Sequence, residues 1–388
     1  MIKSGSYLTL LKLLAAFAAF ILKLYLIERL TTQDFGQYSY FISVTQILSI
    51  FLLFGYNVSL VLTSGQMSYS RNLETVIKFH ALIFLFAIIT LPNFFRIFDV
   101  FLYSMAVILS MYLSIGNTYL NYTKKYFTLG IVDVLKSVIP LIGLLIISIF
   151  INQLSGREAV YLWILGMFIG LVISFRKINF RGLFAKRFAY LRLINLTREG
   201  VKAMSLNFAG ILMYSSDILL IEWILNSFST GDYAKLVVIS RLSWIPNEAF
   251  NTIVFGKLLN KDSVSMSKAV VLNISISAFV AFGLVATGDI AHNYDLLLDI
   301  DFKGSTLMIL LIAGIPVNLY KLFTRYYATE RKWFDLNRAA YVALLLNVLI
   351  NLFFLKKYGI AVAAISSLVS YSIAAFLLII QYMRCAYR

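Results

Sequence analysis

Residues 30–38 read Leu-Thr-Thr-Gln-Asp-Phe-Gly-Gln-Tyr and stand between two long apolar stretches, 6–27 and 38–62. A helix needs about 20 mainly apolar residues to cross the roughly 30 Å hydrocarbon core of a bilayer. Both stretches are long enough, and the polar residues between them fit a short loop at one membrane surface. The pattern therefore predicts a helical hairpin that crosses the membrane twice.

The composition extends this prediction to the whole chain. Of the 388 residues, 61% are hydrophobic and only 13% are charged, and the mean hydropathy is +0.85. Soluble domains are about half apolar and about a quarter charged, so no substantial soluble domain is expected. A net charge of +16 would suggest nucleic acid in a soluble protein. Here most Lys and Arg residues lie in short loops, so we expect membrane lipids and not nucleic acid as partners.

Twelve stretches are long and apolar enough to cross the bilayer, which predicts an all-α polytopic membrane protein. They are 6–27, 38–62, 76–95, 98–120, 127–150, 158–175, 202–227, 234–256, 268–289, 304–327, 337–355 and 359–382. Three of them contain a proline (Pro140, Pro246 and Pro316), where we expect a kink. Freed backbone groups are tolerated in the membrane where neighbouring helices satisfy them.

The loop charges predict the orientation. With the N-terminus inside, the cytoplasmic segments hold 21 Lys and Arg residues and the outer loops hold six. Lys and Arg concentrate in cytoplasmic loops, so both termini are expected on the cytoplasmic side.

The longest connection, 176–201, mixes basic and aromatic residues, as in a helix that lies on an anionic membrane surface. It divides the chain into three predicted regions, an N-terminal six-helix lobe (1–175), a cytoplasmic amphipathic linker (176–201) and a C-terminal six-helix lobe (202–388).

The two predicted lobes carry traces of an internal repeat. Residues 30–38 end in Gly36-Gln-Tyr38, and residues 226–233, after the seventh span, read Asn-Ser-Phe-Ser-Thr-Gly-Asp-Tyr. Likewise, residues 117–124 (Asn-Thr-Tyr-Leu-Asn-Tyr-Thr-Lys) are similar to residues 318–325 (Asn-Leu-Tyr-Lys-Leu-Phe-Thr-Arg). Both copies start inside, so the repeats are parallel. Such halves are related by a pseudo-two-fold axis along the membrane normal and place a substrate site between them.

The Leu30-x-x-x-Asp34-Phe35-Gly36-x-Tyr38 loop resembles that of the Wzx O-antigen and polysaccharide flippases, within the multidrug/oligosaccharidyl-lipid/polysaccharide (MOP) exporter superfamily. Residues 357–364 (Lys-Tyr-Gly-Ile-Ala-Val-Ala-Ala) also resemble this family, with a valine at 362 where the family often has glycine. The resemblance implies a MOP-flippase-like fold in the bacterial inner membrane. It also implies the translocation of an undecaprenyl-diphosphate-linked oligosaccharide to the outer leaflet, in company with other polysaccharide-assembly proteins.

Ionisable residues inside spans are costly and usually face a bundle interior or a wet cavity. They concentrate on the first, seventh and eighth spans. The set is Lys12, Lys23, Asp133, Lys136, Asp217, Glu222, Lys235, Arg241, Glu248 and Lys321. Arg241 and Glu248 are seven residues apart, so they share a helix face. Asp133 and Lys136 can pair at i, i+3, and this pair suits a structural bridge as well as a functional site.

Lys and Arg bind phosphate well, and Arg offers a bidentate fork. The bases expected to line a cationic cavity for a diphosphate or acidic sugars are Lys12, Lys23, Lys235, Arg241 and Lys321. The acids expected to couple transport to a cation, or only to balance charge, are Asp133, Asp217, Glu222 and Glu248. Residues near span ends (Lys23, Glu222 and Lys235) can instead extend to the membrane surface. Alternating access would rock the two halves about this site.

Two alternative functions remain open at this stage. A drug/cation antiporter of the same superfamily would need an acidic cavity, whereas the spans hold more bases than acids. An O-antigen polymerase or ligase would need a large outer loop, and the loops here are short. No metal-ligand constellation, nucleophile motif or nucleotide loop is present in the sequence, so we expect neither a cofactor nor catalysis.

Overall fold

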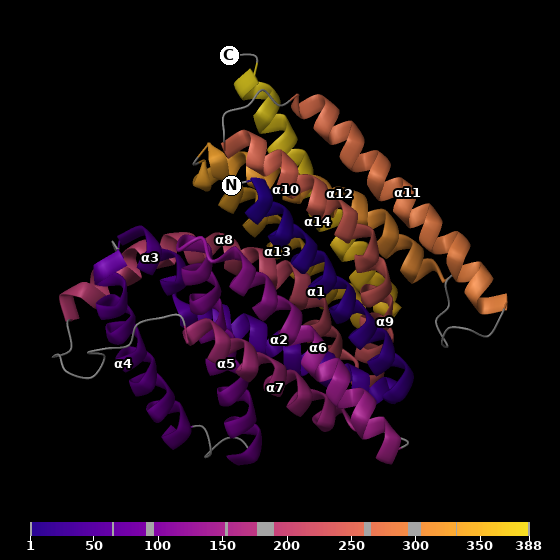
Figure 1. Ribbon diagram of the computed structural model, residues 1–388. Helices are drawn as coiled ribbons and strands as arrows, with labels where there is room; N and C mark the ends of the chain where they lie inside the picture. The colour runs from indigo at the N-terminus through magenta and orange to yellow at the C-terminus, as the bar shows by residue number, and fades with distance from the viewer. Residues whose placement is uncertain are drawn as a thin grey trace. The chain divides into compact units, whose positions relative to one another are not determined.

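The computed structural model describes residues 2–63, 66–90, 97–151, 154–176, 190–259, 265–293, 304–330 and 332–386, and these are nearly all helical. The prediction of an all-α fold is therefore confirmed. The helices of the first half are α1 (Ile2–Arg29), α2 (Thr32–Leu53), α3 (Tyr56–Thr63), α4 (Gln66–Thr90), α5 (Ile97–Tyr122), α6 (Tyr126–Phe150) and α7 (Gly156–Phe175). Those of the second half are α8 (Tyr190–Ile224), α9 (Ser227–Ser240), the 3₁₀ turn η2 (Arg241–Trp244), α10 (Ile245–Leu259), α11 (Met266–Asn293), α12 (Ser305–Thr329), α13 (Trp333–Tyr358) and α14 (Ile360–Ala386) (Figure 1).

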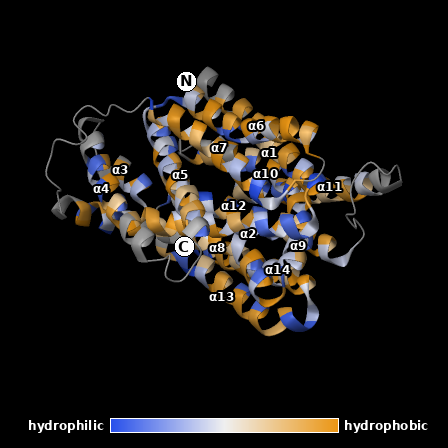
Figure 2. Ribbon diagram, turned by 90° about the horizontal axis from the view of Figure 1, so that it is seen from below, coloured by the Kyte–Doolittle hydropathy of each residue, from blue (hydrophilic) through white to orange (hydrophobic). Residues whose placement is uncertain are grey.

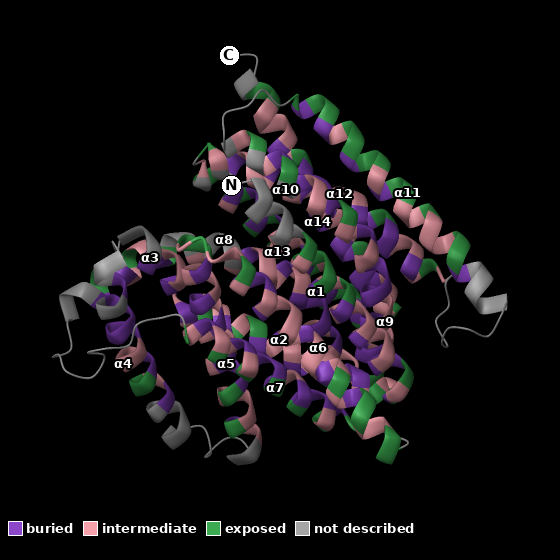
Figure 3. Cartoon of the chain, in the orientation of Figure 1, coloured by how far each residue is buried: buried purple, intermediate pink, exposed green. Residues whose placement is uncertain are grey.

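Within the described ranges, nine helices are long and apolar enough to cross a membrane. Apolar residues dominate helices such as α6, α7 and α13 (Figure 2). The helix α11 is exposed along much of its length (Figure 3), and its exposed side chains include Phe279 and Phe282. Such apolar exposure is expected where lipid replaces water as the solvent. The chain is a multi-pass membrane protein.

Two of the predicted spans are interrupted in the structure. The span predicted over 38–62 breaks between α2 and α3, because Phe54 and Gly55 adopt positive φ angles of 47° and 66°. The span predicted over 234–256 contains η2, and Pro246 lies directly after this turn as the second residue of α10. A short 3₁₀ stretch inside a helix often marks a functional hinge or a strained sequence. The prediction of a continuous helix was wrong at 54–55, whereas the irregularity at η2 lies next to Pro246, where the sequence predicted a kink.

The predicted linker at 176–201 is only partly described, since residues 177–189 lie outside the described ranges. Residues 190–201 form the start of α8, which continues as one 35-residue helix to Ile224. Leu193 and Leu196 are buried in a core with Leu60 and Met111. The Tyr56 hydroxyl lies 2.6 Å from Thr197 Oγ1. This part of the linker therefore packs against protein through one face.

The chain forms two compact units. Unit 1 comprises residues 1–24 and 41–208, and unit 2 comprises residues 25–40 and 209–388. In unit 2, α12 contacts α9, α10, α11, α13 and α14, so it is the central helix. The lobe boundaries given by the sequence remain a prediction.

The glycines of the repeated loop motif face each other within unit 2. A Cβ atom on Gly36 would lie 1.9 Å from the carbonyl oxygen of Ser227, and one on Gly231 would lie 1.9 Å from that of Thr32. Gly36 is four residues after Thr32, and Gly231 is four residues after Ser227, so the contact is reciprocal. Only hydrogen fits at both positions, and the first turns of α2 and α9 approach backbone to backbone. The repeat seen in the sequence is thus a packing contact between equivalent residues.

The second pair of repeated segments also has matching local structure. Thr123 and Thr324 each donate a hydrogen bond of 2.8 Å to the carbonyl oxygen four residues earlier, on Tyr119 and Tyr320. In the segment at 357–364, Gly359 separates α13 from α14 with a φ of 69°. L-residues with a side chain rarely adopt this conformation, which accounts for the glycine.

We expect Gly231→Ala to destabilise the protein, because its methyl group would overlap the Thr32 carbonyl. Overpacking of this kind typically costs about 1–3 kcal/mol, so the melting temperature in detergent micelles should fall. The control is Gly283→Ala on α11, where a Cβ meets nothing within 4 Å. Removing a helical glycine there should leave stability unchanged or raise it by up to about 1 kcal/mol. Equal melting temperatures for the two variants would contradict the close contact.

Candidate functional site

The most buried acid of unit 2 is Asp217 on α8, which is 3% exposed. Its Oδ2 accepts hydrogen bonds from the Tyr233 hydroxyl (2.8 Å) and the Ser367 hydroxyl (2.6 Å). Its Oδ1 accepts from the side-chain amides of Asn347 (3.0 Å) and Asn351 (2.9 Å). These donors come from α9, α13 and α14. Four helices therefore meet at one carboxylate.

The partners of Asp217 are neutral. No ion pair found between described residues includes Asp217, so its direct partners are hydrogen-bond donors. Hydrogen bonding to the charged form favours ionisation, whereas burial opposes it. The surrounding oxygens also belong to groups that can coordinate a monovalent cation. They come from the carboxylate, two amides and the Ser366 and Ser367 hydroxyls.

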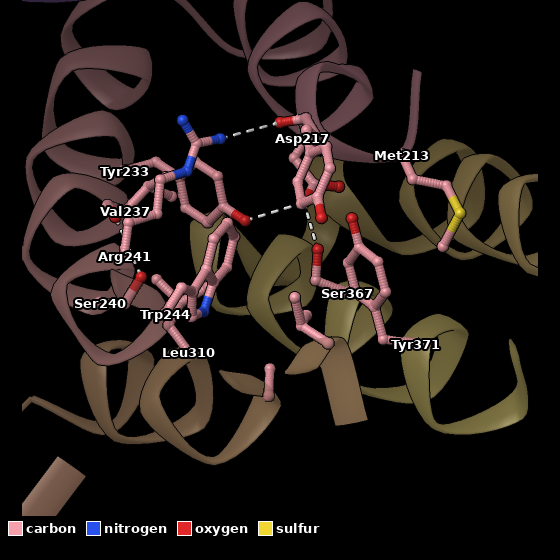
Figure 4. Close-up of a pocket in the computed structure, with 13 residues that line it drawn as sticks. Met213, Asp217, Tyr233, Val237, Ser240, Arg241, Trp244, Leu310, Ser367 and Tyr371 are labelled. Atoms are coloured by element: carbon pink, nitrogen blue, oxygen red, sulfur yellow. Dashed lines mark hydrogen bonds between the residues drawn. The ribbon is translucent and has the colours of Figure 1, made fainter. Parts of the chain in front are cut away.

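A cavity of about 30 Å³ adjoins this carboxylate. It is lined by residues from α8, α9, η2, α12 and α14, among them Asp217, Tyr233, Arg241, Trp244 and Tyr371 (Figure 4). One water needs about 10–15 Å³ measured in this way, so the cavity can hold about two waters or a small ion. It is far smaller than an oligosaccharide.

Arg241 is the cation at this cavity. Its Nη2 donates to the carbonyl oxygen of Tyr214 over 3.4 Å, while its buried Nε has no hydrogen-bond partner. Its guanidinium carbon lies 5.9 Å from the ring centroid of Tyr214 and 5.4 Å from that of Trp244. Aromatic faces attract cations at such distances. They do not satisfy the free N–H, which leaves Arg241 with an unfilled donor next to the cavity.

Lys321 on α12 approaches the same two rings. Its Nζ lies 4.8 Å from the Trp244 centroid and 5.5 Å from the Tyr214 centroid. Unlike Arg241, it also has an acid partner, since its Nζ lies 2.7 Å from Glu248 Oε1. Glu248 Oε2 also accepts from Arg325 Nη2. The described residues at this cavity and around Trp244 thus include three cations (Arg241, Lys321 and Arg325) and two carboxylates, those of Asp217 and Glu248.

A second group of buried polar side chains links α10, α11 and α12. Asn247 and Asn318 each donate to the Ser277 hydroxyl over 3.0 Å, and Asn273 donates to Asn251 over 2.9 Å. All five side chains are at most 1% exposed. Polar side chains of this kind join helices inside a membrane, typically by about 1 kcal/mol per bond.

Of the nine site residues expected from the sequence, the structure places Asp217, Arg241, Glu248 and Lys321 close together in unit 2. Two other expected residues of unit 2 lie at the start of α9. Ser227 Oγ donates to Glu222 over 2.5 Å, and Lys235 Nζ donates to Thr32 Oγ1 over 2.7 Å. Neither lines the cavity.

The three remaining residues belong to unit 1. Lys12 is exposed and Lys23 is half-buried on α1. Asp133 Oδ1 lies 3.7 Å from Lys136 Nζ, which confirms the pairing expected from their i, i+3 spacing.

Sequence reasoning missed the neutral residues that hold Asp217, namely Tyr233, Asn347, Asn351, Ser366 and Ser367. The spacing of Asn347 and Asn351, four residues apart in an otherwise apolar span, places both on one helix face. That signal was available in the sequence, whereas the convergence of α9, α13 and α14 on α8 was not.

Neither a protein-family model nor a curated protein sequence matches the chain. Solved structures do match it over almost its whole length. The lipid II flippase MurJ in an inward closed conformation aligns with a TM-score of 0.69 at 15% identity, over 99% of this chain and 88% of that chain. An inward-facing multidrug resistance MATE family transporter of the MOP superfamily aligns with a TM-score of 0.68 at 13% identity, over 97% and 95% of the two chains.

A third structure is a MOP superfamily transporter from Pyrococcus furiosus Vc1, described as having a binding pocket of reverse polarity. Its TM-score is 0.62 at 13% identity, over 99% of this chain and 96% of that chain. Similarity in structure at such low sequence identity indicates a shared fold but not a shared substrate. The chain therefore has the fold of the MOP-superfamily transporters.

Proposed function

We propose that this protein is a flippase that moves an undecaprenyl-diphosphate-linked oligosaccharide, such as an O-antigen repeat unit, from the cytoplasmic to the periplasmic leaflet. The observation that carries the proposal is Arg241, a cation beside a cavity with an unfilled donor and no acid partner among the described ion pairs. The fold supports alternating access as the mechanism. The protein would lie in a bacterial inner membrane with both termini in the cytoplasm, beside other polysaccharide-assembly proteins.

The electrostatics favour an anionic substrate. A charge inside the membrane is costly and usually has a partner or a wet cavity. Arg241, Lys321 and Arg325 lie near Trp244 or Glu248, and Glu248 supplies only one negative charge. A diphosphate has several acceptor oxygens and could satisfy the fork of Arg241 as well as the ammonium of Lys321. The cationic excess therefore suits a phosphate-bearing lipid headgroup.

The small cavity limits what this site can bind in the conformation described. At about 30 Å³ it admits no sugar, so the proposal assigns to it only the charged end of the substrate. Alternating access requires the site to widen in another state of the cycle. The polyprenyl tail can remain in lipid throughout, because only the polar headgroup pays a penalty for entering hydrocarbon.

Asp217 is proposed as the coupling site, where a proton or a sodium ion binds. It lines the same cavity as Arg241, so its negative charge opposes the entry of a phosphate. A bound cation would neutralise Asp217 and make the cavity more favourable for an anion. Ligands that favour each other's binding in this way are linked reciprocally. Glu222 and Asp133 have local partners, so we assign them structural roles.

A drug/cation antiporter is the alternative transport function. The similarity in fold to a multidrug resistance MATE family transporter supports it. Asp217 would be its substrate carboxylate. The excess of cations around Trp244 argues against this function, since they repel a cationic drug. A polymerase or ligase would be an enzyme, and the structures that match in fold are transporters and a flippase.

We expect Arg241→Ala to abolish surface polysaccharide in cells that lack their own flippase, because the phosphate loses its main hydrogen-bond donor. Loss of one charged contact of this kind reduces function by roughly tenfold or more. Lys12→Ala is expected to have the same effect, because the sequence assigns Lys12 to the same cationic route. Membrane levels of both variants should match the unaltered protein. The control is Lys268→Ala, an exposed lysine at the start of α11. Normal polysaccharide with Arg241→Ala would refute a cationic site at this position.

We expect Asp217→Asn to uncouple transport. In proteoliposomes, flipping by the unaltered protein should increase when a sodium or proton gradient is imposed, and the variant should flip at a rate independent of either gradient. Asn cannot bind a proton or offer a charge to sodium. Ser367→Ala removes one hydrogen bond to Asp217 and should retain the gradient dependence. A gradient response that survives in Asp217→Asn would show that coupling resides elsewhere.

A further inference from the structure

Glu248 is shared by two cations. Its Oε1 lies 2.7 Å from Lys321 Nζ, and its Oε2 accepts from Arg325 Nη2. Arg325 also donates from Nη1 to the main-chain oxygen of Glu248 over 3.5 Å. Lys321 and Arg325 are one helical turn apart on α12, while Glu248 comes from α10. One carboxylate therefore bridges two bases on a neighbouring helix.

The carboxylate is the most accessible member of this group. The side chain of Glu248 is 41% exposed, against 18% for Lys321 and 26% for Arg325. The bases are thus more firmly embedded than the acid that joins them. A conformational change that moves Glu248 outward would take away the carboxylate that pairs with the partly buried Lys321 and Arg325, and another anion could then bind there.

The aromatic residues connect this ion-paired group to Arg241. Trp244 has Lys321 Nζ 4.8 Å and the Arg241 guanidinium carbon 5.4 Å from its ring centroid. Tyr214 contacts the same two cations. The bridged bases and the cation at the cavity therefore belong to one site. Glu248 occupies the part of that site which an anionic ligand would use.

We propose that Glu248 is an internal counter-anion that a phosphate group of the substrate displaces. This inference rests on the proposed function and specifies how the cations are held between transport cycles. Without substrate, the carboxylate neutralises Lys321 and Arg325 and keeps them in position. With substrate, a diphosphate engages Lys321, Arg325 and Arg241, and Glu248 moves toward its exposed side. On release, the carboxylate returns to the two bases.

This exchange has two consequences for selectivity and turnover. A monoanion offers no more charge than the carboxylate it must replace, so it competes poorly for the two bases. A diphosphate carries more charge and more acceptor oxygens, and it can contact all three cations. Specificity of this kind comes from an internal competitor as well as from attractive contacts. Competition from Glu248 also weakens binding enough for the substrate to leave.

The same ion pairs could serve only to join α10 to α12, and a binding measurement separates the two roles. The test uses inorganic pyrophosphate as the probe and purified full-length protein in detergent micelles, with affinity measured by calorimetry. We expect Glu248→Gln to bind pyrophosphate roughly tenfold more tightly than the unaltered protein, because the competing charge is gone. The ratio of its affinity for pyrophosphate to its affinity for acetate, a monovalent anion, should be smaller than in the unaltered protein.

Two further variants keep the test decisive. Glu330→Gln removes one exposed acid just beyond the end of α12 and controls for the change in net charge, so its affinity should be unaltered. Glu248→Asp keeps the negative charge, but its shorter side chain reaches the two bases less well. We expect it to bind pyrophosphate more tightly than the unaltered protein and less tightly than Glu248→Gln. This variant tests the proposal even where Glu248→Gln does not fold. A purely structural role would lower the melting temperature and leave the affinity of the folded protein unchanged.

The outcomes distinguish this inference from the proposed function. If Glu248→Gln or Glu248→Asp, in folded form, binds pyrophosphate no more tightly than the unaltered protein, the counter-anion role is wrong. Absence of pyrophosphate binding in all proteins would also overturn it. Tighter binding by the variants, with no flipping of lipid-linked oligosaccharide by the unaltered protein in vesicles, would support the counter-anion and refute the flippase.

Discussion

A single carboxylate surrounded by neutral donors organises unit 2. Asp217 accepts hydrogen bonds from Tyr233 on α9, Asn347 and Asn351 on α13, and Ser367 on α14. Bonds to a charged acceptor are stronger than neutral ones, at about 1.5–3 kcal/mol each. Leaving these donors unsatisfied inside a membrane would be costly. The positions of four helices therefore depend on one acid, and a change in its charge would affect all of them.

Two acids of the unit, Asp217 and Glu248, are stabilised in different ways. The direct hydrogen-bond partners of Asp217 are neutral, whereas Glu248 is paired with Lys321 and Arg325. An acid held by neutral groups can bind a proton or a cation without first breaking an ion pair. An acid held by two bases can leave them only when another anion takes its place. Asp217 therefore suits a cation, whereas the bases paired with Glu248 suit an anion. Arg241 lines the same cavity as Asp217.

Alternating access requires contacts that hold one conformation without preventing another. The glycine contact between α2 and α9 is tight, since Gly36 and Gly231 leave no room for a methyl group, and the hydrogen bond from Lys235 to Thr32 joins the same two helices. The 3₁₀ turn at Arg241–Trp244 carries both the cavity cation and the aromatic ring that joins it to Lys321. A change in the winding of this turn would move both residues together. Local structure of this kind couples the binding site to backbone motion.

The sequence predicted the class of fold, while the chemistry of the site stays a prediction. Long apolar stretches have an unambiguous meaning in a bilayer, and the charged residues within them are rare enough to be informative. Asp217, Arg241, Glu248 and Lys321 could therefore be found from their positions. The break at Phe54–Gly55 was not predicted, whereas Pro246 marked the region of η2 as a kink without showing that the turn before it is 3₁₀. The neutral partners of Asp217 were also missed, because Asn and Ser in a span are common and only spatial convergence makes them a site.

The reciprocal contact of Gly36 and Gly231 was likewise not predictable from the sequence. The sequence marked the two glycines as equivalent positions of a repeat, and the structure adds that they touch. Similarity between two segments indicates a common local fold, but it contains no information about the distance between them.

We propose that the carboxylate of Asp217 and the cation of Arg241 act on ligands in the cavity that both line. The most direct test compares the pyrophosphate affinity of Asp217→Asn with that of the unaltered protein, by calorimetry at neutral pH, with Glu330→Gln as the charge-matched control. Asp217→Asn should bind pyrophosphate several-fold more tightly, because the variant imitates the cation-bound state and no longer repels the anion. An affinity equal to or weaker than that of the unaltered protein, in a folded variant, would contradict it.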